Sequence, residues 1–65
     1  MELILTKHAR DQMFERGIDE GQIITTIKRG SKIKQTDGFK SLYSYIGVCY
    51  KIIGKKYIIK TVMVE

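Results

Sequence analysis

The chain has 65 residues, a formal net charge of +5, 43% hydrophobic residues and 29% charged residues. This balance is typical of a folded protein, and the length predicts a single domain, residues 1–65. The size excludes a dinucleotide-binding domain or a multi-cofactor enzyme. With one cysteine, Cys49, and one histidine, we expect no disulfide, no metal and no cofactor. Without a signal peptide or a long apolar stretch, we expect a cytoplasmic protein that does not enter a membrane.

The first part of the sequence predicts a short edge strand and a helix. Glu2 to Leu5 is apolar enough for the strand. Thr6 is the expected N-cap of a helix from Lys7 to Arg16, which contains strong helix formers and neither glycine nor proline. Gly17 is the expected C-cap, where a left-handed backbone ends the helix.

A second helix has the clearest local signal in the chain. Asp19 and Gln22 form a capping box, and Ile18 and Ile23 form a hydrophobic staple around it. The apolar stripe continues at helical spacing, and Arg29-Gly30 is expected to end the helix.

From residue 33 the pattern favours β-structure. The expected order is a strand at Ile33–Thr36, a turn at Asp37-Gly38, a long strand from Lys40 through Ile46 that Gly47 bends or divides, a strand at Val48–Ile53, a turn at Gly54-Lys55 and a last strand at Lys56–Val64. The fold prediction is α+β: two N-terminal helices packed on one face of an antiparallel β-meander of three to four strands. The other face of the sheet is expected to stay open.

Basic residues are grouped, which favours an anionic partner. One group lies between residues 28 and 40 and a second between 51 and 60, whereas acidic residues are concentrated between 11 and 20. The alternative interpretation is an ordinary solvated lysine surface. Strand alternation predicts Tyr43 and Tyr45 on one sheet face, where they would stack nucleotide bases. The candidate nucleic-acid-binding residues are Arg10, Lys28, Lys32, Lys34, Lys51, Tyr43 and Tyr45.

The first helix also carries a polar ridge. Counted at 100° per residue from His8, Gln12 lies at about 40° and Arg16 at about 80°. The ridge runs beside the Ala9 and Met13 stripe that we expect to face the core. It is therefore predicted at the rim of the contact between helix and sheet.

The segment Thr6 to Ile18, TKHARDQMFERGI, resembles the T-x-H-A-x-x-R-M-x-x-R-G-I signature of a small domain family of unknown function. Tyr57 to Met63 resembles the strand near the end of its members. Gln12 stands where the family often has arginine, and Met63 where an aromatic residue is common. The matching positions are His8, Ala9, Met13, Arg16, Gly17, Ile18 and Thr61.

That family is grouped with the RelE/ParE-like toxins. The resemblance implies their fold and a metal-independent RNA endonuclease of the mRNA interferase type, or a relative derived from such a toxin. In that function His8 is the expected general acid or base and Arg16 the phosphate ligand. The alternative roles are structural: His8 would hydrogen-bond a strand backbone, and Arg16 would form an ion pair with Glu15, Asp19 or Glu20.

Three classes of partner follow from these interpretations. The nuclease predicts RNA, and an acidic antitoxin-like protein that covers the basic face. A non-catalytic module on the same scaffold would bind nucleic acid or an acidic protein through its lysine-rich surface. A structural role would pair an exposed strand edge with a second copy to form a homodimer.

Overall fold

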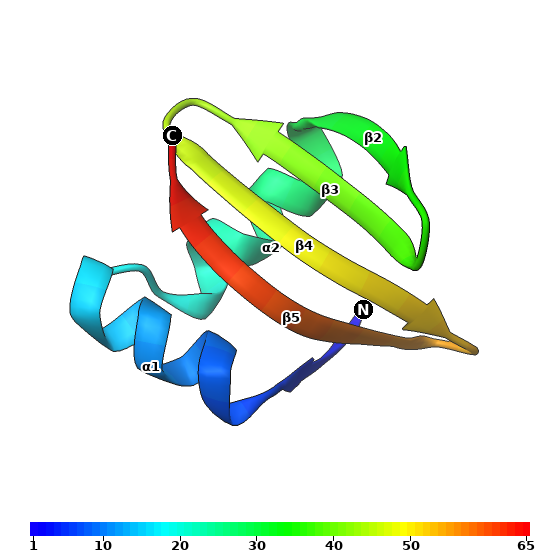
Figure 1. Ribbon diagram of the computed structural model, residues 1–65, viewed down its shortest axis with the longest axis horizontal. Helices are drawn as coiled ribbons and strands as arrows, with labels where there is room; N and C mark the ends of the chain where they lie inside the picture. Colours follow the sequence, from blue (N-terminus) through cyan, green and yellow to red (C-terminus); the bar gives the residue numbers. More distant parts are fainter.

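The structure, a computed structural model, describes all 65 residues. It contains two helices and one five-stranded sheet (Figure 1). The elements in chain order are β1 (Glu2–Leu5), α1 (Lys7–Arg16), α2 (Glu20–Arg29), β2 (Ser31–Gln35), β3 (Gly38–Tyr43), β4 (Ile46–Ile53) and β5 (Lys56–Val64). The α+β class is confirmed, with both helices on one side of the sheet.

Both helices begin as their caps predict. The Thr6 hydroxyl accepts a hydrogen bond from the Ala9 amide (3.2 Å) and donates one to the Ile59 carbonyl (2.9 Å), so the cap of α1 is also its anchor to β5. In α2 the capping box is complete. The Asp19 carboxylate accepts from the Gln22 amide (2.8 Å), and the Gln22 side chain accepts from the Asp19 amide (3.0 Å).

The sheet has one strand more than the largest number expected, and it is mixed rather than antiparallel. Its order is β1-β5-β4-β3-β2, with β1 parallel to β5. Leu3 and Leu5 are half-buried and pack against the core, opposite Tyr57 and Ile59. Pairing with β5 buries these two leucines, and their burial stabilises β1 as an edge strand of the sheet.

The prediction of one long strand from Lys40 through Ile46 is wrong. β3 ends at Tyr43, and a two-residue turn, Ser44–Tyr45, leads into β4, so Gly47 lies inside β4 and divides nothing. Ser44 has a φ of 55°, the sign that the first residue of a type II′ hairpin turn requires. Because Tyr45 is a turn residue, strand alternation does not place it with Tyr43, although both line one pocket.

A β-bulge changes the phase of β5. Cys49 pairs with Thr61 and Tyr50 pairs with Ile59, so Lys60 has no partner on β4. The extra residue lets Ile59 and Val62, both fully buried, face the helices, although strict alternation would put them on opposite faces.

The core lies between the helices and the sheet. α1 packs on β5, and α2 packs across β3 and β4 (Figure 1). The nine buried apolar residues are Ala9, Ile18, Ile23, Ile27, Ile46, Val48, Tyr50, Ile59 and Val62. The opposite side of the sheet, which we call the open face, carries no helix. Neither helix is long and apolar enough to span a bilayer.

Candidate functional site

A groove of about 700 Å³ lies where the end of α2, the β4–β5 turn and the N-terminal residues meet. Lys28 comes from the last turn of α2 and Lys55 from the turn between the two longest strands. The ring of Tyr57 is half-buried beside them. We call this the basic groove; its lining residues are Met1, Glu2, Lys28, Gly54, Lys55 and Tyr57.

A row of aromatic rings connects the groove to β2 at the far edge of the sheet. The rings of Tyr57 and Tyr50 have centroids 5.8 Å apart, and so do those of Tyr50 and Phe39. The ammonium of Lys32 lies 5.6 Å from the centre of the Phe39 ring, a cation–π contact. Lys34 pairs with Phe39 across the strands and therefore projects from the same face of the sheet.

The lysines around this row differ from those of the open face in their partners. Five lysines have no carboxylate within 4.0 Å: Lys28, Lys32, Lys34 and Lys55, which lie around the row and the basic groove, and Lys56, which pairs with Ile53 beside the β4–β5 turn. On the open face, by contrast, Lys40 is bound to Glu65 (2.7 Å), and Lys51 and Lys60 are bound to Asp37. Four of the five lysines without a carboxylate partner are therefore on the helical side of the sheet.

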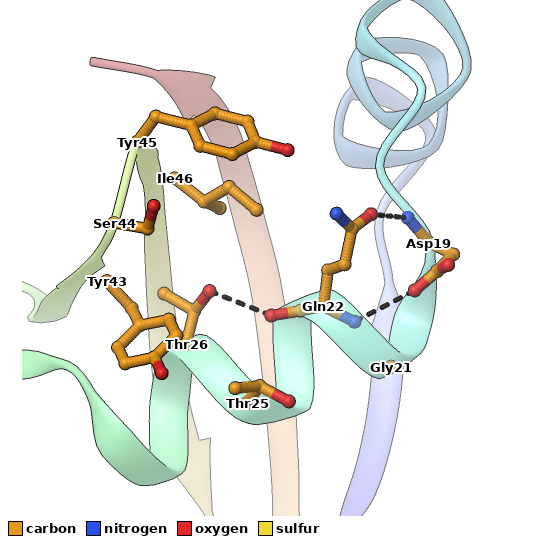
Figure 2. Close-up of a pocket in the computed structure, with 9 residues that line it drawn as sticks. All are labelled: Asp19, Gly21, Gln22, Thr25, Thr26, Tyr43, Ser44, Tyr45 and Ile46. Carbon is orange, nitrogen blue, oxygen red and sulfur yellow. Dashed lines mark hydrogen bonds between the residues drawn. The ribbon is translucent and has the colours of Figure 1, made fainter.

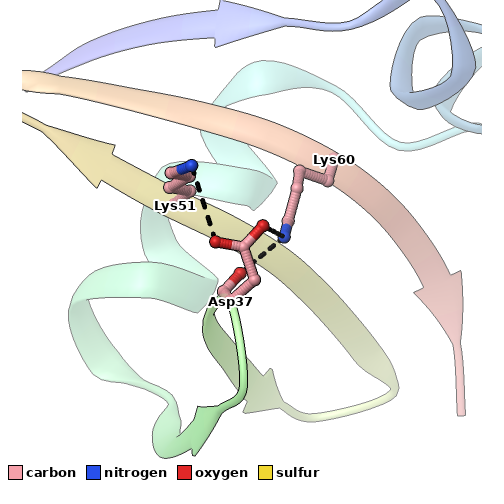
Figure 3. A network of polar contacts seen from close by, with 3 residues as sticks. All are labelled: Asp37, Lys51 and Lys60. Carbon is pink, nitrogen blue, oxygen red and sulfur yellow. Dashed lines mark hydrogen bonds and ion pairs between the residues drawn. The ribbon is translucent and has the colours of Figure 1, made fainter.

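On the open face, Asp37 at the β2–β3 turn bridges two strands (Figure 3). Its carboxylate lies 3.5 Å from the Lys51 ammonium and 3.4 Å from that of Lys60. The Lys60 hydrogen bond, with the charges of Lys51 and Lys60, holds the pKa of Asp37 below its ordinary value of 3.8. The bulge makes this contact available, because it leaves Lys60 and Thr61 together on the open face. Nearby, Glu65 raises the pKa of Lys40 through a hydrogen bond.

These ion pairs predict a pH-dependent stability. Because the pKa of Asp37 is lower in the folded chain, the network stabilises the fold above about pH 4 and loses this effect as the pH falls below 3.8. Asp37→Asn should therefore lower the thermal midpoint at neutral pH, and the difference from wild type should shrink in acid. Asp11→Asn, which breaks only the exposed pair with Lys7, is the control. A difference that stays constant with pH would show that the charge of Asp37 contributes nothing.

The polar ridge of α1 lies along the edge of β5. The Gln12 side-chain oxygen accepts a hydrogen bond from the Val62 amide (2.8 Å). Gln12 thus provides a partner for the exposed edge of β5 beyond the point where β1 ends. His8 and Arg16 are exposed on either side of it. Neither makes the structural contact considered from the sequence: His8 has no strand hydrogen bond, which Thr6 and Gln12 make instead, and Arg16 has no ion pair.

The predicted site residues fall into separate places. His8 and Arg16 lie on α1 at β5, whereas Lys32 and Lys34 lie on β2, three strands and about 14 Å away. Arg10 is exposed about 160° around α1 from His8. Tyr43 and Tyr45 line a second pocket at the other end of α2 from Lys28. Lys55 and Tyr57 also line the basic groove, although neither was among the predicted nucleic-acid-binding residues; the lysine group between residues 51 and 60 was the available signal for Lys55.

The fold and the groove thus define a small α+β domain with unpaired cations at one end of its helical layer. No group of three or more His, Cys, Asp and Glu residues is arranged to hold a metal ion. Residues 5–64 match the family described as a domain of unknown function (DUF4258), and the chain belongs to this family. The resemblance to a small family of unknown function is therefore confirmed. No curated protein and no solved structure matches the chain significantly.

Proposed function

We propose that the protein is an RNA-binding domain related to the RelE/ParE-like toxins, and that the basic groove binds the backbone of a single-stranded RNA. The observation that carries this proposal is the set of four lysines without carboxylate partners around an aromatic row. Cations that follow a phosphate backbone, with rings on which bases stack, are the usual means of binding single strands. The order of two helices followed by a meander agrees with the toxin relationship.

An acidic protein is the alternative partner for the same lysines. It would neutralise Lys28 and Lys55 equally well, but it would make no particular use of the Tyr57 ring or of Lys32 above Phe39. Of the two candidate ligands, RNA is the one that uses both the charges and the rings, so the groove favours RNA.

The test is the binding of a labelled single-stranded RNA of about ten nucleotides, measured by fluorescence anisotropy across a salt series with EDTA present. Replacing Lys28 and Lys55 together by glutamine should weaken binding at least about tenfold, because two phosphate contacts are lost. The slope of log K against log salt should become shallower by about 1.4.

The matched control is the double variant Lys7→Gln/Lys51→Gln, which removes the same charge from lysines that already have carboxylate partners. It should bind nearly as well as the wild type. Equal weakening by both double variants would mean that only net charge matters and that the groove is not the site. A wild-type chain that fails to bind RNA at low salt would overturn the function itself.

Metal-independent RNA cleavage is a second candidate function, favoured by the exposure of His8 and Arg16 on one helix without internal partners. Cleavage of this kind needs a proton-transfer group and a cation for the developing negative charge. The same RNA, run on a denaturing gel after incubation, tests it. Cleavage by the wild type that is abolished in both His8→Ala and Arg16→Ala supports a nuclease. RNA that stays intact with the wild type supports a domain that binds RNA without cleaving it.

A further inference from the structure

A pocket of about 480 Å³ lies at the opposite end of α2 from the basic groove (Figure 2). The first two turns of the helix form one wall, and the β3–β4 turn forms the other. Tyr43 is 38% exposed and Tyr45 50% exposed, so both keep ring surface available. The lining residues are Asp19, Gly21, Gln22, Thr25, Thr26, Tyr43, Ser44, Tyr45 and Ile46.

The β3–β4 hairpin that carries the two rings is held in place. Tyr43 pairs with the buried Ile46 across the hairpin. The Tyr45 carbonyl accepts a hydrogen bond from the Glu65 amide (2.7 Å), which ties the turn to the end of β5. An anchored backbone keeps both rings beside the pocket before a ligand binds, which lowers the conformational entropy lost on binding. The pocket therefore offers a preformed ring surface.

Several polar groups in the pocket have no partner within the protein. The Gln22 side-chain oxygen is used by the capping box, but its amide NH₂ donates no hydrogen bond. The Thr25 hydroxyl and the Tyr45 hydroxyl make none either, whereas the Thr26 hydroxyl donates to the Gln22 carbonyl (2.7 Å). In Figure 2 the Gln22 side chain extends from the helix between Asp19 and the tyrosines. Free donors and acceptors thus lie beside aromatic rings.

The charge of the pocket selects the class of ligand. No lysine, arginine or histidine lines it, so it is not suited to a phosphate. Its one carboxylate, Asp19, already accepts a hydrogen bond from the Gln22 amide and caps α2. A flat, neutral ring with its own donors and acceptors fits the remaining groups best. A nucleobase has this chemistry.

The position of the pocket relates it to the basic groove. Thr25 and Lys28 are three residues apart on α2, so their side chains are neighbours on the same face of the helix. A strand whose base occupies the pocket can therefore continue along α2 toward the Lys28 ammonium. We propose that this pocket binds a single unstacked nucleobase of the RNA, with Tyr45 as the stacking ring and Gln22 and Thr25 as hydrogen-bonding groups. This inference rests on the proposed function.

The test titrates the isotope-labelled protein with each of the four neutral ribonucleosides and follows the backbone and tyrosine signals by NMR. Saturable shifts should be confined to the pocket, and Tyr45→Leu should weaken binding about tenfold. Thr25→Val should weaken the binding of the four nucleosides to different extents, because they differ in their hydrogen-bonding edges. Phe14→Leu, which removes a ring that is 90% exposed on α1, is the matched control and should have no effect.

Three outcomes would overturn the inference. They are the absence of any saturable shift with nucleosides, a loss of binding in Phe14→Leu as large as in Tyr45→Leu, and displacement of the nucleosides by tetramethylammonium, which would make the pocket a cation site. The RNA experiment with Lys28→Gln/Lys55→Gln separates this result from the proposed function. If RNA binding still depends on those lysines while nucleosides do not bind, only the nucleobase pocket is wrong. If nucleosides bind and RNA does not, the proposed function is wrong, and with it the assignment of the pocket to RNA.

Discussion

Gly38→Ala is expected to destabilise the domain by about 3–4 kcal/mol, which for a protein of this size is a large part of the whole free energy of unfolding. Gly38 opens β3 with a φ of 117°, a conformation that side chains rarely adopt. A Cβ there would also lie less than 3.0 Å from the Tyr50 carbonyl oxygen on the neighbouring strand. The backbone of β3 or β4 must move to accept it, and the Phe39–Tyr50 pairing is directly beside it.

The matched control is Gly54→Ala. Gly54 also has a positive φ, 61°, but an added Cβ would meet nothing within 4 Å. This variant isolates the cost of the backbone conformation, about 1–2 kcal/mol. Urea denaturation of both variants should therefore give a clearly larger loss for Gly38→Ala. Equal losses would show that the sheet accommodates the extra atom without strain.

Tyr50→Ala is the second substitution with a large expected effect, about 3–5 kcal/mol. Tyr50 is fully buried, its ring lies between those of Phe39 and Tyr57, and its hydroxyl is 3.2 Å from the Ser41 hydroxyl. Truncation removes two aromatic contacts and leaves both a cavity and a buried hydroxyl without a partner. Thermal or urea unfolding measures the loss.

Smaller substitutions separate the two contributions. Tyr50→Phe keeps the ring but leaves the Ser41 hydroxyl without its partner, at a cost of about 1–3 kcal/mol. Adding Ser41→Ala to this variant should recover part of the loss, because no polar atom then stays buried alone. If the two single losses simply add, the hydroxyl pair does not stabilise the core.

The helices could be predicted from the sequence because their signals are local. Thr6 and the Asp19–Gln22 capping box define where α1 and α2 begin, and Gly17 adopts the left-handed backbone that its C-cap position predicts. The sheet could not be predicted in the same way. The turn at Ser44–Tyr45 has serine, not glycine, at the position with positive φ, so the usual sequence signal for a turn is missing. The bulge at Lys60 interrupts the alternation of side chains between the two faces of β5, and no local pattern in the sequence marks it.

In the candidate site, too, the residues with a local signal could be predicted and those brought together by the fold could not. Lys28, Lys32 and Lys34 were identified from local charge, and the structure places all three on the helical side of the sheet. Lys51, from the same reasoning, is paired with Asp37, a residue fourteen positions earlier that only the folded sheet brings near. Lys55 joins Lys28 for a similar reason, because the β4–β5 turn reaches the end of α2 only in the complete fold.

The parallel pairing of β1 with β5 has a consequence for how the chain folds. Strands β2 to β5 are joined by two-residue turns, so their contacts form between near neighbours in the sequence. Glu2, by contrast, pairs with Lys56, which closes a loop containing almost the entire chain. During synthesis β1 therefore waits for β5, which is made after β2, β3 and β4, and Leu3 and Leu5 stay unpaired until β5 has been made.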